Sequence, residues 1–322
     1  MNILITSVGK RVSLVKIFKQ ELTAIYPKGQ VITIDVAPEL SAACQVADQS
    51  FRVPRIDAND YLNTLISICV EQKVTLIIPT IDTELAFLAK NEKVLLEYGI
   101  KTVISTEFFI NKCRDKHKIH DFFTEHHIRV AKEYKKDNYT LPLFIKPVDG
   151  SRSVDTYTIL KEQDLRPYHF SNDKLMFLEY LDHEVYEEYT CDLYYDKNHT
   201  LRCAVPRKRI EVRDGEVNKG LTERNALVDY IKEKLSYIEG ARGCLTAQFF
   251  KHKETQDIVG IEINPRFGGG YPLTNLAGAT YAKWIIEEYL FEQTISDNFD
   301  IWESNLLMLR YDDEILVHGY KC

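Results

Sequence analysis

The chain has 322 residues, a length typical of two or three domains with substantial cores. Hydrophobic residues make up 45% of the sequence and charged residues 28%, a composition that excludes a disordered chain and a membrane protein. The formal net charge of -7 argues against a general affinity for the nucleic-acid backbone, so we expect no nucleic-acid partner.

The 7 cysteines are scattered and contain no CxxC pair. This pattern favours reduced thiols over a disulfide framework or a zinc cluster. The N-terminus has no charged segment before its short apolar run, and no later stretch approaches the length of a membrane span. We therefore expect a cytoplasmic protein with no membrane partner.

Strands and helices alternate along the first 107 residues. Apolar runs predict buried strands at residues 2–6, 31–35, 75–79 and 101–104. Amphipathic spacing predicts helices around residues 14–22, 61–70 and 84–96. Such alternation is typical of a doubly wound parallel sheet.

Polar residues follow the carboxyl ends of these strands, which is where ligands bind in such sheets. The substrate candidates are Gly9, Arg11, Asp35, Asp82 and Glu84. In an alternative interpretation, Gly9 only makes a turn and Asp82 only caps the helix that begins near residue 83. No GxGxxG follows the first strand and no GxxxxGK[ST] motif occurs, so a dinucleotide site is disfavoured.

The pattern changes near residue 111, where a helix rich in lysine and histidine begins. Further strands are predicted at residues 143–147, 185–195, 200–212, 245–251, 257–263 and, at an edge, 306–310. Most of them alternate polar and apolar residues, as antiparallel strands do. Helices are predicted at residues 221–239 and 272–291. The second part of the chain is therefore expected to be α+β, with mainly antiparallel sheets.

A metal site is suggested by the strand that ends near residue 264. Alternation places Glu262 and Asn264 on one face, with Ile261 and Ile263 pointing into the core. Magnesium prefers a few protein oxygens completed by phosphate and water, and Gln248 is the natural third ligand. The alternative is a polar sheet face without a metal.

Several basic residues suggest that an anion binds near this strand end. Arg266 offers a planar fork to phosphate or carboxylate, and the three glycines after Phe267 allow close backbone approach. Lys146 lies at the end of an apolar strand, where a bound anion would offset the cost of burying its charge. The loop at 149–154 could lay the hydroxyls of Ser151 and Ser153 over phosphates, or form a plain turn.

Three further segments allow two interpretations each. Residues 177–181 resemble a strand that enters a hinge able to read an adenine edge, and the acids that follow could hold ribose or form a solvated hairpin. The strip 205–213 places Arg207 and Arg209 on one face, as an anion platform or a soluble surface. His117 and His120 have a spacing that a metal could use, but we prefer the surface of a helix.

These motifs, in this order, resemble the ATP-grasp superfamily, and within it the single-copy proteins similar to the carbamoyl phosphate synthase large subunit. The resemblance covers nearly the whole chain. It rests on residues 5–11, 79–85, 115–116, 145–147, 179–181, 188–192 and 262–266. It implies a Rossmann-like pre-ATP-grasp domain at 1–107, a small ATP-grasp lobe at 108–182 and a large lobe with the magnesium site at 183–322.

The resemblance also implies roles for individual residues. Those implied to hold ATP are Lys116 and Lys146 at the phosphates, Glu179, Tyr180 and Leu181 at adenine, and Glu188, or else Glu187, at ribose. Those implied to bind magnesium, or manganese in its place, are Gln248, Glu262 and Asn264. Arg266 would steady an acyl phosphate. Arg207 and Lys219 would be further anion contacts.

The expected activity is that of a ligase, which joins a small-molecule carboxylate to an amine or a thiol through an acyl phosphate and releases ADP and phosphate. Three alternatives stay open: a carbamate or carboxyphosphate kinase that uses bicarbonate, a non-catalytic ATP sensor and a nicotinamide dehydrogenase. Dimers are common among the proteins that the chain resembles, which leaves room for a homodimer.

Overall fold

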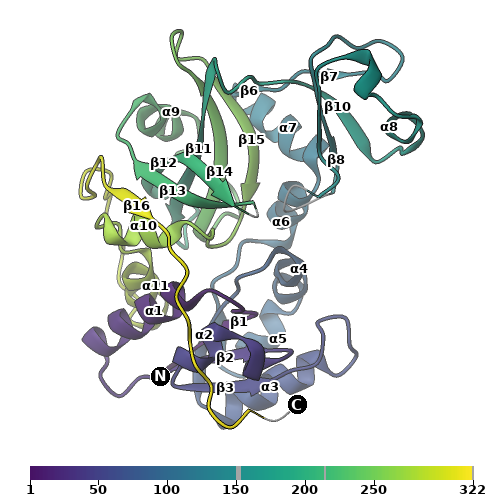
Figure 1. Cartoon of the computed structure of the whole chain (residues 1–322). Coiled ribbons are helices and arrows are strands. Elements are labelled where there is room, and N and C mark those ends of the chain that lie inside the picture. The colour runs from purple at the N-terminus through teal and green to yellow at the C-terminus, as the bar shows by residue number, and fades with distance from the viewer. Residues whose placement is uncertain (150–153, 214, 321–322) are drawn as a thin grey trace.

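The computed structural model describes residues 1–149, 154–213 and 215–320. Ser151 and Ser153, which were expected near phosphates, lie outside this part of the chain. The described residues form three sheets of five, four and seven strands. Figure 1 shows the five-stranded sheet at the bottom and the other two side by side above it. None of the described helices has the length and apolar character needed to cross a bilayer.

The N-terminal sheet is parallel, with strand order β3-β2-β1-β4-β5. Its elements are β1 (Asn2–Thr6), α1 (Val12–Ile25), β2 (Val31–Asp35), η1 (Pro38–Leu40), α2 (Ala42–Val46), β3 (Gln49–Arg52), α3 (Tyr61–Glu71), β4 (Val74–Ile78), α4 (Asp82–Lys90), α5 (Glu92–Glu97) and β5 (Lys101–Thr102). Ile3, Leu4 and Ile5 of the central strand are fully buried because helices cover both faces. The predicted doubly wound sheet is confirmed.

The middle of the chain forms a small antiparallel sheet, with strand order β7-β10-β8-β9. The elements here are α6 (Glu107–Arg114), α7 (Lys116–Glu125), β6 (Arg129–Val130), β7 (Glu133–Tyr134), β8 (Leu143–Pro147), β9 (Tyr157–Ile159), η2 (Glu162–Asp164), α8 (Pro167–Ser171) and β10 (Leu175–Glu179). The short strand β6 belongs to the third sheet. We keep the division into residues 1–107, 108–182 and 183–322 as a proposal.

The third sheet has the order β16-β13-β12-β11-β14-β15-β6 and is antiparallel except where β6 joins β15. Its elements are β11 (Tyr186–Tyr195), β12 (Leu201–Arg213), β13 (Glu216–Thr222), α9 (Ala226–Lys234), β14 (Gly243–His252), β15 (Ile258–Asn264), α10 (Tyr271–Leu276), α11 (Tyr281–Leu290) and β16 (Leu307–Leu309). The predicted antiparallel strands and the edge strand are confirmed.

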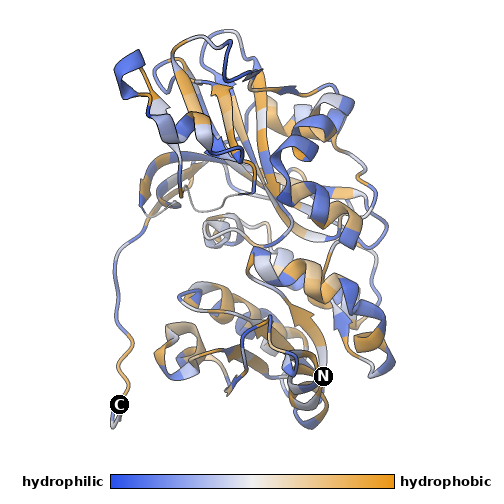
Figure 2. Ribbon diagram, turned by 90° about the vertical axis from the view of Figure 1, so that its right-hand side faces the viewer, coloured by the Kyte–Doolittle hydropathy of each residue, from blue (hydrophilic) through white to orange (hydrophobic). Residues whose placement is uncertain are grey.

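The first and third sheets share one apolar core. α10 and α11 pack against α1, and Phe18 of α1 meets Phe267 edge to face with ring centroids 5.7 Å apart. In Figure 2 many strand residues are hydrophobic, whereas the helices carry hydrophilic stretches. The segment after β16 stands apart from the rest in that view, and Tyr311 and Leu316 within it are exposed.

Three predicted helices are wrong in extent. The helix expected at residues 84–96 is divided at Asn91 into α4 and α5. The helix expected at 221–239 is only α9, because Leu221 and Thr222 end β13, Asn225 caps the start of α9, and Tyr237 beyond its end pairs with Thr200. The helix expected at 272–291 is interrupted near Gly278, whose φ of +107° lies outside helical geometry.

The expected orientation of Ile261 is also wrong. The pairing of β14 with β15 shifts register between Gln248 and Phe249, so two residues of β15 lie opposite one of β14. Ile263 points into the main core as predicted. Ile261 instead packs on a separate apolar cluster that includes Met176. The bulge therefore puts Ile261 on the side of the sheet that faces the small lobe.

Candidate functional site

The oxygen-bearing residues at the end of β15 lie together. Gln248 is the cross-strand partner of Glu262, and Asn264 Nδ2 donates to Glu262 Oε1 over 2.9 Å. One carboxylate and two side-chain amides thus share a small area of the third sheet. Such oxygen donors suit magnesium, which takes few protein ligands when phosphates and water complete its shell. Within the described ranges, no group of three His, Cys, Asp or Glu is arranged to hold a metal.

Lys146 and Lys116 lie near these oxygen donors; Lys146 belongs to β8 of the second sheet, and Lys116 begins α7, which packs on β15. Both side chains are 7% exposed. Burial is the main cause that lowers the pKa of both, that of Lys146 to about 8, while the carboxylate of Glu262 acts in the opposite direction on each. The two lysines therefore lie close enough to Glu262 for its carboxylate to act on both.

Asp115 explains how Lys116 reaches this position. Its backbone is extended, so the helical conformation is interrupted between α6 and α7. Its carboxylate accepts hydrogen bonds from the amides of His117 and Lys118 at the start of α7. The amide of Lys116 donates to the carbonyl of Val148 over 3.0 Å. The first turn of α7 is thereby fixed beside the end of β8, where Lys146 lies.

An apolar cluster fills the space between the two lobes beside these charges. Its buried members are Ala131, Met176, Leu178, Leu181 and Val259. Just after β10, the amides of Tyr180 and Leu181 make no hydrogen bond to any other described residue. The carboxylate of Glu179 is occupied by Arg129 Nη2 at 2.6 Å and by the amide of Lys132 at 3.1 Å. A flat apolar ligand could therefore meet free backbone donors here.

The structure separates the two ribose candidates. Glu187 accepts from Lys208 Nζ over 2.6 Å and from the hydroxyl of Tyr189 over 3.0 Å. Glu188 has its carboxylate 3.1 Å from Arg209 Nε, and burial is the main cause that raises its pKa, with a further contribution from Glu262. Glu188 is thus the acid that interacts electrostatically with Glu262, a proposed metal ligand.

Arg207 does not reach an open surface. It is 1% exposed and pairs with Asp192 through Nε at 2.8 Å and Nη2 at 3.0 Å. Among the described residues, no group accepts from its Nη1. A Cβ built on Gly270 would lie 2.0 Å from that nitrogen, so the guanidinium packs directly under the glycine segment. Lys219 is half exposed and pairs with Glu211 over 2.5 Å.

Arg266 is fixed by a residue from the N-terminal sheet. Its Nε and Nη2 donate to the two oxygens of Asp82 over 2.8 and 2.6 Å. Asp82 therefore does more than cap α4, whose N-cap is Ile81. Arg11 Nη1 donates to the carbonyl of Phe267 over 3.1 Å, and burial followed by the nearby charge of Arg266 lowers the pKa of Arg11 to about 10.

The other substrate candidates are Gly9 in the loop after β1, Asp35 at the end of β2 and Glu84 in the first turn of α4. The carboxylate of Glu84 is fully buried and accepts hydrogen bonds from Thr6, Ser7, Thr80 and Ile81. Gly9 has a φ of +48°, and its amide donates to Asp35 over 3.1 Å. The hydrogen bonds of Glu84 and Gly9 therefore fix the segments that follow β1 and β4, and Gly9 directly precedes Lys10 and Arg11 in the sequence.

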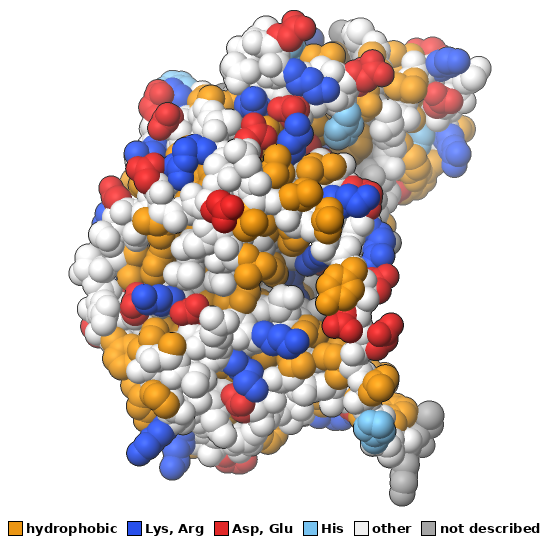
Figure 3. Space-filling view, turned by 60° about the vertical axis from the view of Figure 1, so that its left-hand side comes forward, with side chains coloured by type: hydrophobic (Ala, Val, Ile, Leu, Met, Phe, Trp, Pro, Cys, Tyr) orange, Lys and Arg blue, Asp and Glu red, His pale blue; other side chains and the backbone are white. Residues whose placement is uncertain are grey.

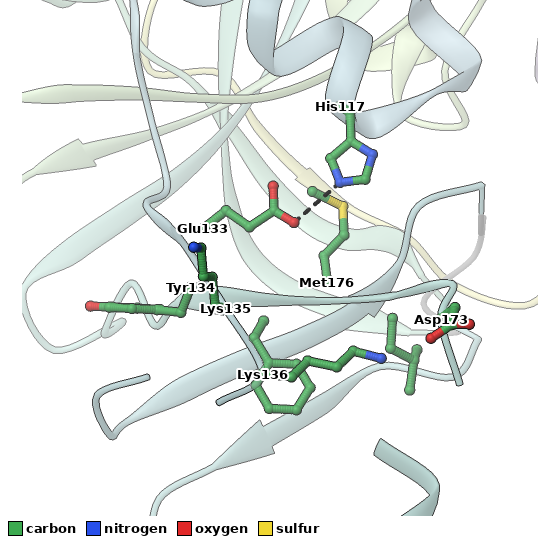
Figure 4. Close-up of a pocket in the computed structure, with 9 residues that line it drawn as sticks. His117, Glu133, Tyr134, Lys135, Lys136, Asp173 and Met176 are labelled. Carbon is green, nitrogen blue, oxygen red and sulfur yellow. Dashed lines mark hydrogen bonds and ion pairs between the residues drawn. The ribbon is translucent and has the colours of Figure 1, made fainter. Parts of the chain in front are cut away.

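A hollow of about 510 Å³ lies at β7 and β10 of the second sheet and reaches the start of α7. Figure 4 shows His117 reaching from α7 toward Glu133, with Met176 beside the pair. The two charged groups are 3.1 Å apart. Met176 is the cross-strand partner of Lys146, so the hollow borders the lysines, but none of the metal candidates lines it.

Sequence reasoning missed the partners that organise this site. Asp82 was a candidate, but its pairing with Arg266, 184 residues away, has no local signal. Glu216 and Arg310 were also missed. They form an ion pair of 2.9 Å beside Gly269, and each sits in a segment whose sequence reads as ordinary surface.

Two family models match this chain. Residues 3–104 match the PylC-like N-terminal domain, and residues 171–304 match the family described as ATP-grasp in the biosynthetic pathway with Ter operon. A comparison with curated proteins gives no significant match.

Solved structures share the fold over most of the chain. The biotin carboxylase domain of Hydrogenobacter thermophilus 2-oxoglutarate carboxylase, in complex with MgADP, ADP and bicarbonate, is 15% identical, with 95% of this chain and 73% of that chain covered and a TM-score of 0.70. Campylobacter jejuni biotin carboxylase is 14% identical, with 95% and 74% covered and a TM-score of 0.71. N5-carboxyaminoimidazole synthetase from Staphylococcus aureus, complexed with ADP, is 17% identical, with 88% and 76% covered and a TM-score of 0.66.

Proposed function

Because the chain is an ATP-grasp protein, we propose that it is an ATP-dependent carboxylate–amine ligase, which forms an acyl phosphate and releases ADP and phosphate. One observation carries the proposal. Two buried lysines, Lys116 and Lys146, lie near the carboxylate of Glu262, which has two neighbouring amide side chains. Cations opposite oxygen ligands suit the triphosphate of a magnesium nucleotide.

The nucleotide would lie between the second and third sheets. The apolar cluster around Met176 and Leu181 would cover the adenine, whose edge would meet the backbone after Glu179. Glu188 would hold the ribose, because Glu187 is engaged by both Lys208 and Tyr189, whereas among the described residues the ion partner of Glu188 is Arg209 alone. Lys116 and Lys146 would contact the phosphates, which would offset the cost of burying both charges. Complexes of related folds with ADP or an ATP analogue support this placement.

Gln248, Glu262 and Asn264 would hold magnesium, with manganese as an alternative. The donor set fits a hard cation, since the three side chains offer oxygens from adjacent strands of one sheet. The hydrogen bond from Asn264 Nδ2 to Glu262 leaves the amide oxygen of Asn264 available. When bound, the ion would neutralise phosphate charge and orient the triphosphate.

The chemistry needs no nucleophilic side chain. An oxygen of the substrate carboxylate attacks the γ-phosphorus, the bond from that phosphorus to the β,γ-bridging oxygen breaks, and ADP leaves. Lys146 would offset charge on the transferring group, and Arg266, held in place by Asp82, would steady the acyl phosphate. An amine then attacks the acyl carbon, the carbon–oxygen bond to phosphate breaks, and the nitrogen loses a proton. Arg207, beneath the glycine segment, and the half-exposed Lys219 of β13 would be further contacts for the anionic groups.

Bicarbonate is the second candidate for the carboxylate. The biotin carboxylase domain of 2-oxoglutarate carboxylase was solved with bicarbonate, which supports this possibility. The protein would then make carboxyphosphate as its first product. An ATPase activity that requires bicarbonate and no other carboxylate would distinguish this case from the first.

The proposed partners are small molecules. Figure 3 shows basic and acidic side chains interspersed on one face, with no extended strip of a single sign. A homodimer is also proposed, supported by the dimer in which the 2-oxoglutarate carboxylase domain was solved. Light scattering of the purified chain would measure its mass and so test the homodimer. We also propose that the protein is cytoplasmic.

The test is a screen of carboxylate and amine libraries for release of ADP from Mg-ATP. We expect at least one carboxylate to stimulate ADP release and a matching amine to be consumed with it. If ATP binds but no carboxylate, bicarbonate or amine stimulates hydrolysis, the protein is a nucleotide sensor and the ligase proposal is wrong.

A further inference from the structure

A small cavity lies between the first loop of the N-terminal sheet and the glycine segment after β15. Its volume is about 40 Å³, and the residues that line it include Lys10, Arg11, Ser13, Glu216, Gly269 and Arg310. One water molecule needs roughly 10–15 Å³ measured in the same way. The space therefore admits a group of a few heavy atoms, such as a carboxylate, and excludes a base or a sugar.

Two arginines from distant parts of the chain bracket the glycine segment. Arg11 donates to the carbonyl of Phe267 over 3.1 Å, and Arg310 donates to the carbonyl of Gly269. Arg310 Nη1 also donates to Glu216 over 2.9 Å, and Lys10 Nζ lies 3.7 Å from the same carboxylate. Hydrogen bonds thus tie the walls of the cavity to one another and fix Arg11 and Arg310, whereas the side chain of Lys10 is largely exposed.

Positive charge is in surplus around this cavity. The cations are Lys10, Arg11, Arg266 and Arg310, and the carboxylates are Asp82, Glu84 and Glu216. Four cations against three carboxylates leave one positive charge, even if the fully buried Glu84 is counted as ionised. Arg11 and Arg266 are close enough that each repels the other, and burial strengthens this repulsion. An anion in the cavity would relieve it.

The cavity is separate from the metal corner. None of Gln248, Glu262 and Asn264 lines it. Gly268 follows Asn264 by four residues, which span at most about 14 Å when extended. A molecule with a spacer of several bonds can therefore place one group at the metal corner and another in the cavity.

Building on the proposed ligase function, we infer that this cavity binds a second anionic group of the carboxylate substrate. The substrate class is then a carboxylate that carries another small anion at its far end, such as a second carboxylate or a phosphonate. Arg310 and Arg11 select this group, and Glu216 holds Arg310 in position.

The experiment measures ADP release from Mg-ATP by the full chain, with hydroxylamine as a general amine that traps acyl phosphates as hydroxamates. The probes are glutarate and adipate, 3-phosphonopropionate, and the monocarboxylates butyrate and hexanoate. We expect half-maximal ADP release at a concentration about 10-fold or more lower for the best dianionic probe than for the monocarboxylate of similar length. The dicarboxylate and phosphonate arms show which second anion is preferred.

Arg310→Gln should reduce this preference about 5-fold or more, and Arg310→Lys should restore part of it. Arg224→Gln is the matched control, because Arg224 also pairs with one carboxylate and donates to a backbone carbonyl, but it lies away from the cavity. That control should keep the preference of the unaltered chain. The melting temperature of each variant shows whether it folds, and the comparison of probes with the unaltered chain does not depend on any variant.

Two failures are distinguishable. Equal half-maximal concentrations for monocarboxylates and dianionic probes would overturn the inference while the ligase function stands. ADP release with bicarbonate alone would also overturn the inference, and it would favour the bicarbonate candidate over the first proposal. Absence of ADP and hydroxamate with every probe and with the carboxylate library, while ATP still binds, would overturn the proposed function and the inference that rests on it.

Discussion

Arg266 donates two hydrogen bonds to the carboxylate of Asp82, from Nε over 2.8 Å and from Nη2 over 2.6 Å. This pair joins the end of β15, which carries the proposed magnesium ligands, to the start of α4 in the N-terminal sheet. The geometry is bidentate and both side chains are largely buried, so the guanidinium is held in one orientation. The N-terminal sheet therefore positions a group that we place at the acyl phosphate.

Replacing Asp82 should impair chemistry more than nucleotide binding. Asp82→Asn keeps the size of the side chain but removes the charge that orients Arg266, so we expect kcat to fall about 10-fold or more while KM for ATP changes less than about 2-fold. Steady-state ADP release checks this. Asp300→Asn, which removes an exposed partner of Arg224, should leave both constants unchanged. An equal loss in the two variants would contradict the role given to Asp82.

The protonation of Lys146 should set an alkaline limit to ATP binding. Its pKa is lowered to about 8, chiefly by burial, so the free protein loses this charge as pH rises through 8. Affinity for ATP should therefore fall above about pH 8, and Lys146→Arg should move that fall to higher pH because arginine stays protonated. Isothermal titration at pH 7, 8 and 9 measures it. A flat profile in the unaltered chain would remove Lys146 from the phosphate site.

The same shift has a consequence for stability. The unfolded chain holds the proton of Lys146 up to about pH 10.5, whereas the folded chain releases it near 8. The unfolded state thus binds more protons between these values, so this residue alone makes the free energy of unfolding rise with pH in that window. The free energy of unfolding would rise by roughly 3 kcal/mol at most, the cost of keeping Lys146 charged in the folded chain.

Glu188, and not Glu187, should contribute to nucleotide affinity. If Glu188 accepts from ribose, Glu188→Gln should raise KM for ATP about 10-fold, the usual loss for one charged hydrogen bond. Glu187→Gln is the matched control on the neighbouring residue, and KM should change less than about 2-fold because its carboxylate faces Lys208. The opposite order would move the ribose site to Glu187.

Glu262 should be indispensable for magnesium-dependent turnover. We expect Glu262→Ala to abolish ADP release while the circular dichroism spectrum stays that of the folded chain. Glu262→Gln, which keeps the volume but loses the charge, should need about 10-fold more magnesium for any residual activity. Normal activity of the alanine variant would remove the metal site from the account.

Gly270 should tolerate no side chain. A Cβ there would lie 2.0 Å from Arg207 Nη1 and 2.6 Å from Val217 Cγ1, so we expect Gly270→Ala to lower the free energy of unfolding by about 2 kcal/mol or more. Gly99→Ala meets no atom within 4 Å but has a φ of +73°, and should cost about 1 kcal/mol. Urea titrations compare the two. A smaller loss at Gly270 would mean that Arg207 can move aside.

Local patterns predicted much of this molecule. The strand at residues 2–6 and the oxygen donors at 262 and 264 follow from apolar runs and period-two alternation, which act over a few residues. The helix expected at 221–239 is shorter at both ends, because residues 221–222 pair with β12 and Tyr237 pairs with Thr200, and both pairings depend on distant partners. The direction of Ile261 failed because a bulge depends on the partner strand.

The site was predicted less completely than the fold. Lys146 and Glu262 were proposed from their own surroundings, and the structure places them close enough for the carboxylate to act on the lysine. The contacts that fix Arg266 and Arg310 join residues far apart in sequence, namely Asp82 and Glu216. No spacing rule encodes such contacts, because Asp82 meets Arg266 only when the first and third sheets pack, and Glu216 meets Arg310 only when β13 and β16 pair.

One isotope measurement tests the central claim most directly. The carboxylate that gives the most ADP release is prepared with ¹⁸O in both oxygens and supplied with Mg-ATP and an amine. An acyl phosphate transfers one labelled oxygen from carbon to phosphorus, so the account predicts one ¹⁸O in each inorganic phosphate, with ADP as the other product. Label in AMP, with pyrophosphate released, would contradict it.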